Sequence, residues 1–219
     1  MAEVVKANAT VLRSAGFKKR RHCFNRVTSA GLVHVVYFWQ HPKEPPAWTE
    51  VPGLRERRYG TFRLDFGVYV PSMTRSGSPQ GSWINEYNCH LRRTIGQLLG
   101  DNAGDWWWPL SDPEADNVAH TALVDHGLPW LDRFPDHECV FQAFKASGAL
   151  GVGMSPAGAL DVAQMLSAIN RDEEARSVLE EYVSQPVLQS HAYYLGEYLP
   201  GIGHGDLVSK VQVRGPSPA

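Results

Sequence analysis

The chain has 219 residues and a formal net charge of −2, and 43% of its residues are hydrophobic. This length suits one large globular domain, or a domain with an appended subdomain, and the composition excludes a globally disordered chain. No apolar run approaches the roughly 18 residues that a membrane helix needs. The N-terminal stretch is charged and lacks the apolar core of a signal peptide, so we expect a cytoplasmic protein without a membrane segment.

The first half of the chain predicts one helix followed by strands. Residues 3–15 space their apolar side chains as a helix does, and Gly16 follows where a left-handed cap is favourable, with Phe17 making the accompanying apolar contact. Strands are predicted at 22–27, 32–40, 61–70 and 87–95. The alternation is strictest in 61–70, which predicts a half-buried strand with one apolar face. The segment 92–99 could also begin a helix.

After residue 108 the period changes to that of helices. Helical segments are predicted at 113–125, 136–147, 159–169, 175–183 and 187–199. A boundary is expected at 150–156, with Ser155 as the N-cap and Pro156 as the first helical residue. We therefore predict an α+β domain over 1–150, a helical subdomain over 151–204, and a flexible tail over 205–219.

The predicted fold class is α+β. Strands joined by loops favour an antiparallel meander, so we expect a small antiparallel sheet of about four strands. Helices should cover this sheet, and a C-terminal helical subdomain should follow it.

Six segments, in this order and spacing, resemble the DUF4304 family of bacterial domains of unknown function. They are GFKKRRHCF (16–24), VHVVYFWQ (33–40), FRLDFGVYVP (62–71), CHLRRTIGQL (89–98), DWWWPL (105–110) and LPWLD (128–132). The resemblance covers about the first 150 residues and implies no reaction, cofactor or catalytic residue. Some members of the family look like accessory proteins of toxin–immunity loci. The C-terminal hairpin is similar to one tetratricopeptide-like unit, which we expect to act as a cap because a solenoid needs about three units.

The sequence predicts neither a metal site nor a cofactor. Each cysteine has a histidine close by (His22-Cys23, Cys89-His90, and His137 two residues before Cys139), but these spacings match no zinc signature. The chain also lacks GxSxG, SxxK and P-loop patterns.

Catalytic side chains are equally hard to find in the sequence. Cys23, which follows a basic run, is the best electrostatic candidate for a reactive thiol, although its strand position predicts a packed residue. Acid and base types occur together at 125–126 and 136–138, but without a paired nucleophile.

Charge is distributed unevenly along the chain. Residues 1–100 hold 15 lysines and arginines against 6 acidic residues, whereas residues 101–219 hold 6 against 17. This asymmetry indicates either a basic binding face or two halves that dock on each other. Basic segments with Trp39, Trp48 and Trp83 nearby would suit single-stranded nucleic acid. The sequence pI of about 6.5 and the lack of a recognition motif argue against that partner.

Trp106, Trp107 and Trp108 are consecutive, and three adjacent indoles cannot all face one core. At least one ring should be partly exposed or line a groove; alternatively, two rings are buried and one caps the edge of the sheet. We predict a non-catalytic cytoplasmic binding protein, an immunity-like or accessory partner of another protein. Its anchors would be Arg92, Arg93 and one of Trp106–Trp108. The alternative is an enzyme of unassigned class at the same edge, which would need a deep pocket with convergent titratable groups.

Overall fold

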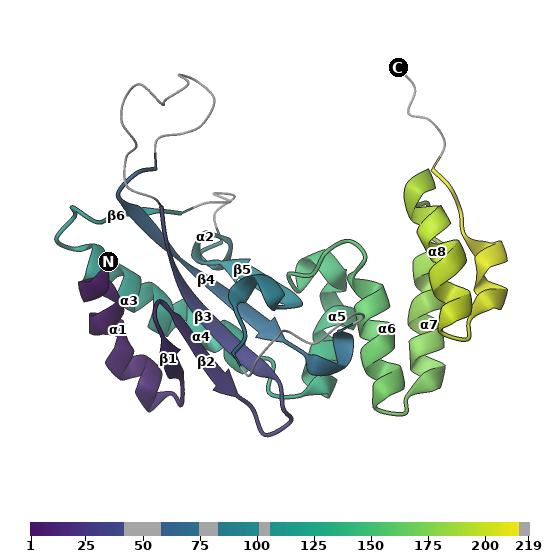
Figure 1. Ribbon diagram of the computed structural model, residues 1–219, viewed down its shortest axis with the longest axis horizontal. Helices are drawn as coiled ribbons and strands as arrows, with labels where there is room; N and C mark the ends of the chain where they lie inside the picture. Colours follow the sequence, from purple (N-terminus) through teal and green to yellow (C-terminus); the bar gives the residue numbers. More distant parts are fainter. Residues whose placement is uncertain (42–57, 75–82, 101–105, 215–219) are drawn as a thin grey trace, which may run out of the picture. The chain divides into compact units, whose positions relative to one another are not determined.

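A computed structural model describes residues 1–41, 58–74, 83–100 and 106–214. The chain divides into two compact units. The first consists of Met1–Pro71 and Gly77–Met154, and the second of Ser72–Ser76 and Ser155–Ala219. The predicted α+β class is confirmed: an antiparallel sheet forms the N-terminal part, and helices follow it (Figure 1). None of the helices in the described ranges has the length and hydropathy needed to span a bilayer.

The sheet of the first unit is larger than predicted. Its strands are β1 (Lys18–Arg20), β2 (Cys23–Val27), β3 (Val33–Gln40), β4 (Thr61–Tyr69), β5 (Leu91–Thr94) and β6 (Trp108–Pro109). The order is β1-β2-β3-β4-β5 with antiparallel pairs throughout, and β6 pairs with one end of β4. The two additional strands have no apolar alternation to detect, because β1 is charged and exposed and β6 has only two residues.

The strand predicted at 87–95 is only partly correct. A 3-10 turn, η3 (Glu86–Asn88), precedes β5, and helix α2 (Ile95–Leu98) follows it directly. Thr94 ends the strand because its side chain accepts a hydrogen bond from the backbone N–H of Gln97, whose own side chain accepts one from the backbone N–H of Thr94. This reciprocal capping starts a helix, the alternative that the sequence left open.

One face of the sheet, which we call the helix face, is defined by Phe62, Leu64 and Phe66 of β4. The elements in the helical layer on it are α1 (Ala2–Ser14), α3 (Ala115–Ala122), the π-helical turn η4 (Leu123–Gly127) and α4 (Leu128–Asp132). Packing is close: a Cβ on Gly127 would lie 2.3 Å from the ring of Phe66. Glycine at this position therefore lets η4 approach the middle of β4.

The opposite face, the second face, carries Arg63, Asp65, Gly67 and Tyr69. The segment 83–90 lies over it, and a Cβ on Gly67 would lie 2.5 Å from the Sγ atom of Cys89. A small apolar core forms there from Cys23, Val35, Tyr69, Ile84 and Cys89. The prediction of a half-buried strand is therefore wrong for β4, because every residue from Leu64 to Tyr69 is buried.

The first unit ends with α5 (His137–Gly151). Asp136 caps this helix by accepting a hydrogen bond from the N–H of Cys139 (2.8 Å). Gly148 interrupts the helix with a φ of +68°. The carbonyl of Gly153 then accepts a hydrogen bond from the N–H of Arg92 (2.9 Å), which ties the end of the unit to β5.

The second unit is helical. Its elements are α6 (Gly158–Ala168), α7 (Asp172–Val183), α8 (Gln189–Gly201) and the 3-10 helix η5 (Gly205–Lys210), and a short turn, η2 (Pro71–Met73), leads into it. α6 and α7 form the predicted hairpin and turn at Asn170, whose φ is +61°. The predicted start of α6 is wrong by two residues, since Ala157 and not Ser155 is the N-cap.

Part of the segment expected to be a flexible tail has defined structure. Asp206 in η5 pairs with Arg176 of α7, and Lys210 pairs with Glu180 at 3.3 Å. Further on, the N–H of Arg214 donates to the carbonyl of Val187 at 2.8 Å. Residues 215–219 lie outside the described residues.

Candidate functional site

The three consecutive tryptophans occupy three different environments. Trp108 is buried on the helix face, with its ring 5.5 Å from that of Phe62. Trp107 lies on the second face and is half-buried, whereas Trp106 is 40% exposed. Of the three, only Trp108 belongs to β6, where it pairs with Phe62 of β4; Trp106 and Trp107 precede the strand. Only one of the three indoles is fully buried.

A cavity of about 310 Å³, which we call the tryptophan pocket, lies between the end of α2, β6 and the α3–η4 helix. Its apolar lining consists of Leu99, Trp106, Trp108, Val118 and Ala122. Asn117, Thr121 and His126 supply the polar part of the wall. Among the described lining residues, His126 is the only titratable one.

The rim of the tryptophan pocket is both apolar and acidic. Val118 is 47% exposed, next to the exposed ring of Trp106. Along the segment that leads through α3 and η4, the exposed or half-buried acidic side chains are Asp112, Glu114, Asp116 and Asp125. Glu114 is in contact with the pocket wall, since its Oε2 accepts a hydrogen bond from Nδ2 of Asn117 (3.1 Å).

Trp107 belongs to an aromatic and cationic cluster on the second face. Its ring lies 5.4 Å from Trp39 and 4.4 Å from His41. The guanidinium of Arg63 lies 4.6 Å from the Trp107 ring and also pairs with Asp65, with Nε 2.7 Å from Oδ1 and Nη2 3.1 Å from Oδ2. Trp107 is thus part of the packing over the sheet and does not line the tryptophan pocket.

Asp65 is a buried carboxyl group in the middle of this second face. Burial raises its pKa to about 6, because the charged form loses its hydration, and the neighbouring Arg63 only partly opposes this effect. The alternation in the sequence placed Asp65 on a polar face exposed to solvent, and the segment over that face removes the solvent.

Arg92 and Arg93 lie on opposite faces of β5. Arg92 forms an ion pair with Glu86, which raises the pKa of its guanidinium. Arg93 donates from Nη2 to the carbonyls of Leu150 (2.9 Å) and Gly151 (2.6 Å) at the end of α5. Cations at a helix C-terminus satisfy its free carbonyls, so Arg93 has a packing partner within its own unit.

The structure brings together only some of the predicted anchors. Trp106 and Trp108 line one pocket. In the register of the sheet, Trp108 lies opposite Phe62 of β4 and Arg92 lies opposite Gly67 of β4. Phe62 and Gly67 are five residues apart along that strand. At the usual rise of a strand, this separates the two positions by about 17 Å. Arg92 and Arg93 are therefore not part of the tryptophan pocket.

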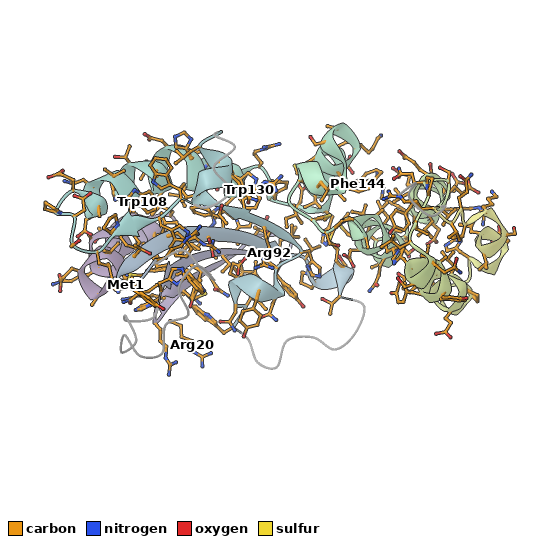
Figure 2. The ribbon with its side chains drawn as sticks, turned by 90° about the horizontal axis from the view of Figure 1, so that it is seen from above. Met1, Arg20, Arg92, Trp108, Trp130 and Phe144 are labelled. Carbon is orange, nitrogen blue, oxygen red and sulfur yellow. The ribbon has the colours of Figure 1, made fainter. Side chains whose placement is uncertain are left out.

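A second cavity, of about 800 Å³, lies beside the β1–β2 hairpin, and we call it the basic hairpin cavity. The hairpin contributes Lys19, Arg20, Arg21, His22 and Cys23 to its lining, and Ala2, Val5, Tyr37, Trp83 and Asn85 complete it. Figure 2 shows Arg20 on the side of the sheet away from Trp108 and Trp130. The basic run and Trp83 were visible in the sequence, but the cavity needs the pairing of β1 with β2. Trp48, the third aromatic of that sequence pattern, lies outside the described residues.

The cysteines do not have the properties of reactive thiols. Burial raises the pKa of Cys23 to about 11 and that of Cys89 well above its ordinary value. Burial therefore opposes the thiolate form that a nucleophilic Cys23 would need, and its packed strand position is confirmed. The neighbour of Cys89 in the chain, His90, has a backbone partner: its Nδ1 accepts a hydrogen bond from the N–H of Val70 (3.1 Å). Within the described ranges, no three His, Cys, Asp or Glu side chains group closely enough to hold a metal ion.

Known proteins give no indication of what this site binds. The chain matches no family model, no curated protein and no solved structure. The DUF4304 resemblance stays a prediction from the six segments.

Proposed function

We propose that the protein is a non-catalytic binding protein whose tryptophan pocket receives one large apolar side chain of a protein partner. The observation that carries this proposal is the lining of the pocket. Trp108 is a buried wall, and Trp106 and Val118 are exposed at the mouth. A volume of about 310 Å³ lies at the lower end of the range of ligand pockets, roughly 300–1,000 Å³, which suits a single side chain.

The chemistry of the pocket favours binding over catalysis. A catalytic site gathers several titratable groups whose environments shift their pKa values. Here His126 stands alone among the described lining residues, and the strongly shifted Asp65 lies on the other face of the sheet. An enzyme at this edge, the alternative from the sequence, has less support from the geometry.

The charges around the pocket suggest what the partner looks like. Glu114 accepts a hydrogen bond from Nδ2 of the lining residue Asn117 (3.1 Å), and the exposed Asp125 precedes the lining residue His126 in the chain. A partner that places an aromatic or large aliphatic side chain between lysines or arginines would complement this rim. Complementary charge speeds association and selects the partner, while the buried anchor supplies most of the affinity.

An immunity-like or accessory role is consistent with this mode of action. Such proteins act by binding another protein, and this is what the DUF4304 resemblance implies for some members of that family. A cytoplasmic location belongs to the same proposal. It is supported by the three cysteines, which are free thiols.

The proposal is tested by selecting binding peptides from a displayed random library and measuring their affinities. We expect enrichment of peptides with one aromatic or large aliphatic residue flanked by lysine or arginine. Trp106→Ala and Val118→Asp should weaken their binding by at least about tenfold. Glu173→Ala, which removes an exposed charge in the second unit, is the matched control and should leave affinity unchanged.

Two results would contradict the proposal. One is enrichment of acidic peptides or of peptides without an apolar anchor. The other is a larger loss of binding for Glu173→Ala than for Trp106→Ala, which would place the interface on the helical unit. Each variant is first shown to melt as the wild type does.

A further inference from the structure

The basic hairpin cavity gathers positive charge without local compensation. Lys19, Arg20 and Arg21 all line it, and none of them has a hydrogen bond or ion pair with a side chain of the described residues. By contrast, Arg26, Arg63 and Arg92 of the same sheet are each paired with an acidic side chain. Cations without a side-chain partner at one cavity favour a ligand with several negative charges.

The hairpin turn holds one of these cations in an unusual backbone conformation. Arg20 pairs with Cys23, so the turn consists of Arg21 and His22 alone. Arg21 has a φ of +55°, a region where turns of this kind favour glycine, asparagine or aspartate. A charged residue with a long side chain is retained where a smaller one would be less strained. Such outliers cluster at sites that bind ligands.

Two aromatic residues also line the basic hairpin cavity. Tyr37 and Trp83 line the cavity, and both are half-buried and pack against the small core of the second face. Rings fixed in this way offer a surface on which a planar aromatic ligand can stack. The volume of about 800 Å³ is within the range of small-molecule sites.

A different explanation for the basic run is protection of the sheet edge. Lysine and arginine on an edge strand prevent pairing with other chains, and β1 is an edge of this sheet. That explanation suffices for Lys18, which is not among the described lining residues. It does not explain why Arg20 and Arg21 line the same cavity as Tyr37 and Trp83, whereas Lys19, opposite Phe24 in β2, belongs to the other face of the sheet.

We propose that the basic hairpin cavity binds a nucleoside polyphosphate. The phosphates would lie against Arg20 and Arg21, and the base would stack on Trp83 and Tyr37, because Arg20 shares the face of Tyr37 in the register of the sheet. Arginine suits this role because its planar guanidinium donates two parallel hydrogen bonds to phosphate oxygens. This site is separate from the tryptophan pocket, and the inference does not depend on the function proposed for that pocket.

The experiment is calorimetric titration of the full chain with ATP, tripolyphosphate and adenosine. ATP should bind, tripolyphosphate should bind on the order of tenfold more weakly because it lacks the ring, and adenosine should give no signal at ~1 mM. Arg20→Ala and Arg21→Gly should each weaken ATP binding at least about tenfold. Trp83→Leu should weaken ATP but leave tripolyphosphate unchanged, since only the stacking surface is lost.

Two variants show whether a loss of ATP binding comes from the cavity itself, from a general loss of positive charge or from unfolding. Lys18→Ala removes a cation of the same hairpin that is not among the described lining residues, and it should change ATP affinity by less than about twofold. Arg21→Gly relieves the positive φ, so its melting temperature should equal or exceed that of the wild type while binding is lost.

Four outcomes would overturn the proposal. The first is no ATP binding at ~1 mM. The second is equal affinity for ATP and tripolyphosphate, which would mean that the rings have no role. The third is a loss for Lys18→Ala as large as that for Arg20→Ala, which would indicate unspecific attraction. The fourth is displacement of ATP by a polyglutamate peptide at equal concentration, which would assign the cavity to acidic peptides.

Discussion

The two faces of the sheet are buried in different ways. The helix face is apolar and continuous, with Phe62, Leu64 and Phe66 fully buried under a helical layer. The second face is covered by segment 83–90 and includes a buried charge pair, Asp65 with Arg63. Burial of apolar area on the helix face stabilises the unit directly, whereas burial of a carboxyl group reduces part of that gain. Side chains that are equally buried on the two faces therefore contribute differently to the stability of the unit.

The helix face should show the largest effect of a single truncation. Phe66→Ala removes a fully buried ring that contacts Gly127, and we expect a loss of about 3–5 kcal/mol in the free energy of unfolding. Urea denaturation measures it. Val27→Ala is the control, because Val27 is 68% exposed and its truncation should change stability by less than about 0.5 kcal/mol. Equal midpoints for the two variants would mean that the face assignment of β4 is wrong.

The second face should make stability depend on pH through Asp65. Its folded pKa of about 6 lies above its ordinary value of 3.8, so the folded state binds the proton more tightly than the unfolded state. Tighter proton binding by the folded state therefore stabilises it relative to the unfolded state. This stabilisation is fully present below the ordinary pKa of 3.8 and is lost as the pH rises through about 6. A shift of about two units corresponds to about 3 kcal/mol over that window.

The test for Asp65 is urea denaturation between pH 4 and pH 7. Asp65→Asn cannot titrate, so its stability should fall less over this range than that of the wild type. If both proteins lose the same amount, the carboxyl group is not the source of the pH dependence, and the second face is more hydrated than its burial indicates.

Close packing of segment 83–90 on the second face gives a smaller effect. Gly67→Ala places a methyl group against Cys89, and we expect a loss of about 1–3 kcal/mol from overpacking. Combining it with Cys89→Gly should destabilise less than the sum of the two single changes, because the clash disappears. Additive effects in this double-mutant cycle would show that the segment can move away from the sheet.

The smallest expected effect is that of metal removal. Cys23 and Cys89 belong to the same small core, and we predict that packing and not zinc holds this core. Elemental analysis of protein purified without chelator should find well under one metal per chain, and EDTA should leave the melting temperature unchanged. Stoichiometric zinc that leaves together with the fold would make the second face a metal centre.

Of the pocket's described lining residues, only Trp106 and Trp108 were predicted from the sequence. The prediction was that three adjacent indoles would not share one core, and Trp106 is indeed exposed at the pocket. The role of Arg93 was not accessible, because its partners Leu150 and Gly151 lie more than 50 residues away in the chain. The basic hairpin cavity was also missed, since Trp83 lies more than 60 residues from the cations of the hairpin in the chain.

Elements with a local signal could be predicted from the amino-acid sequence. The periods of 61–70, 159–169 and 175–183 predicted β4 and the helical hairpin, and Gly16 indeed adopts the left-handed cap, with a φ of +85°. The segment that covers the second face, and the way in which β1 and β6 join the sheet, depend on contacts between distant parts of the chain. Periodicity reports which side chains share a face, because it depends on backbone geometry alone. It does not report which distant segment packs on that face, and burial of Asp65 depends on that packing.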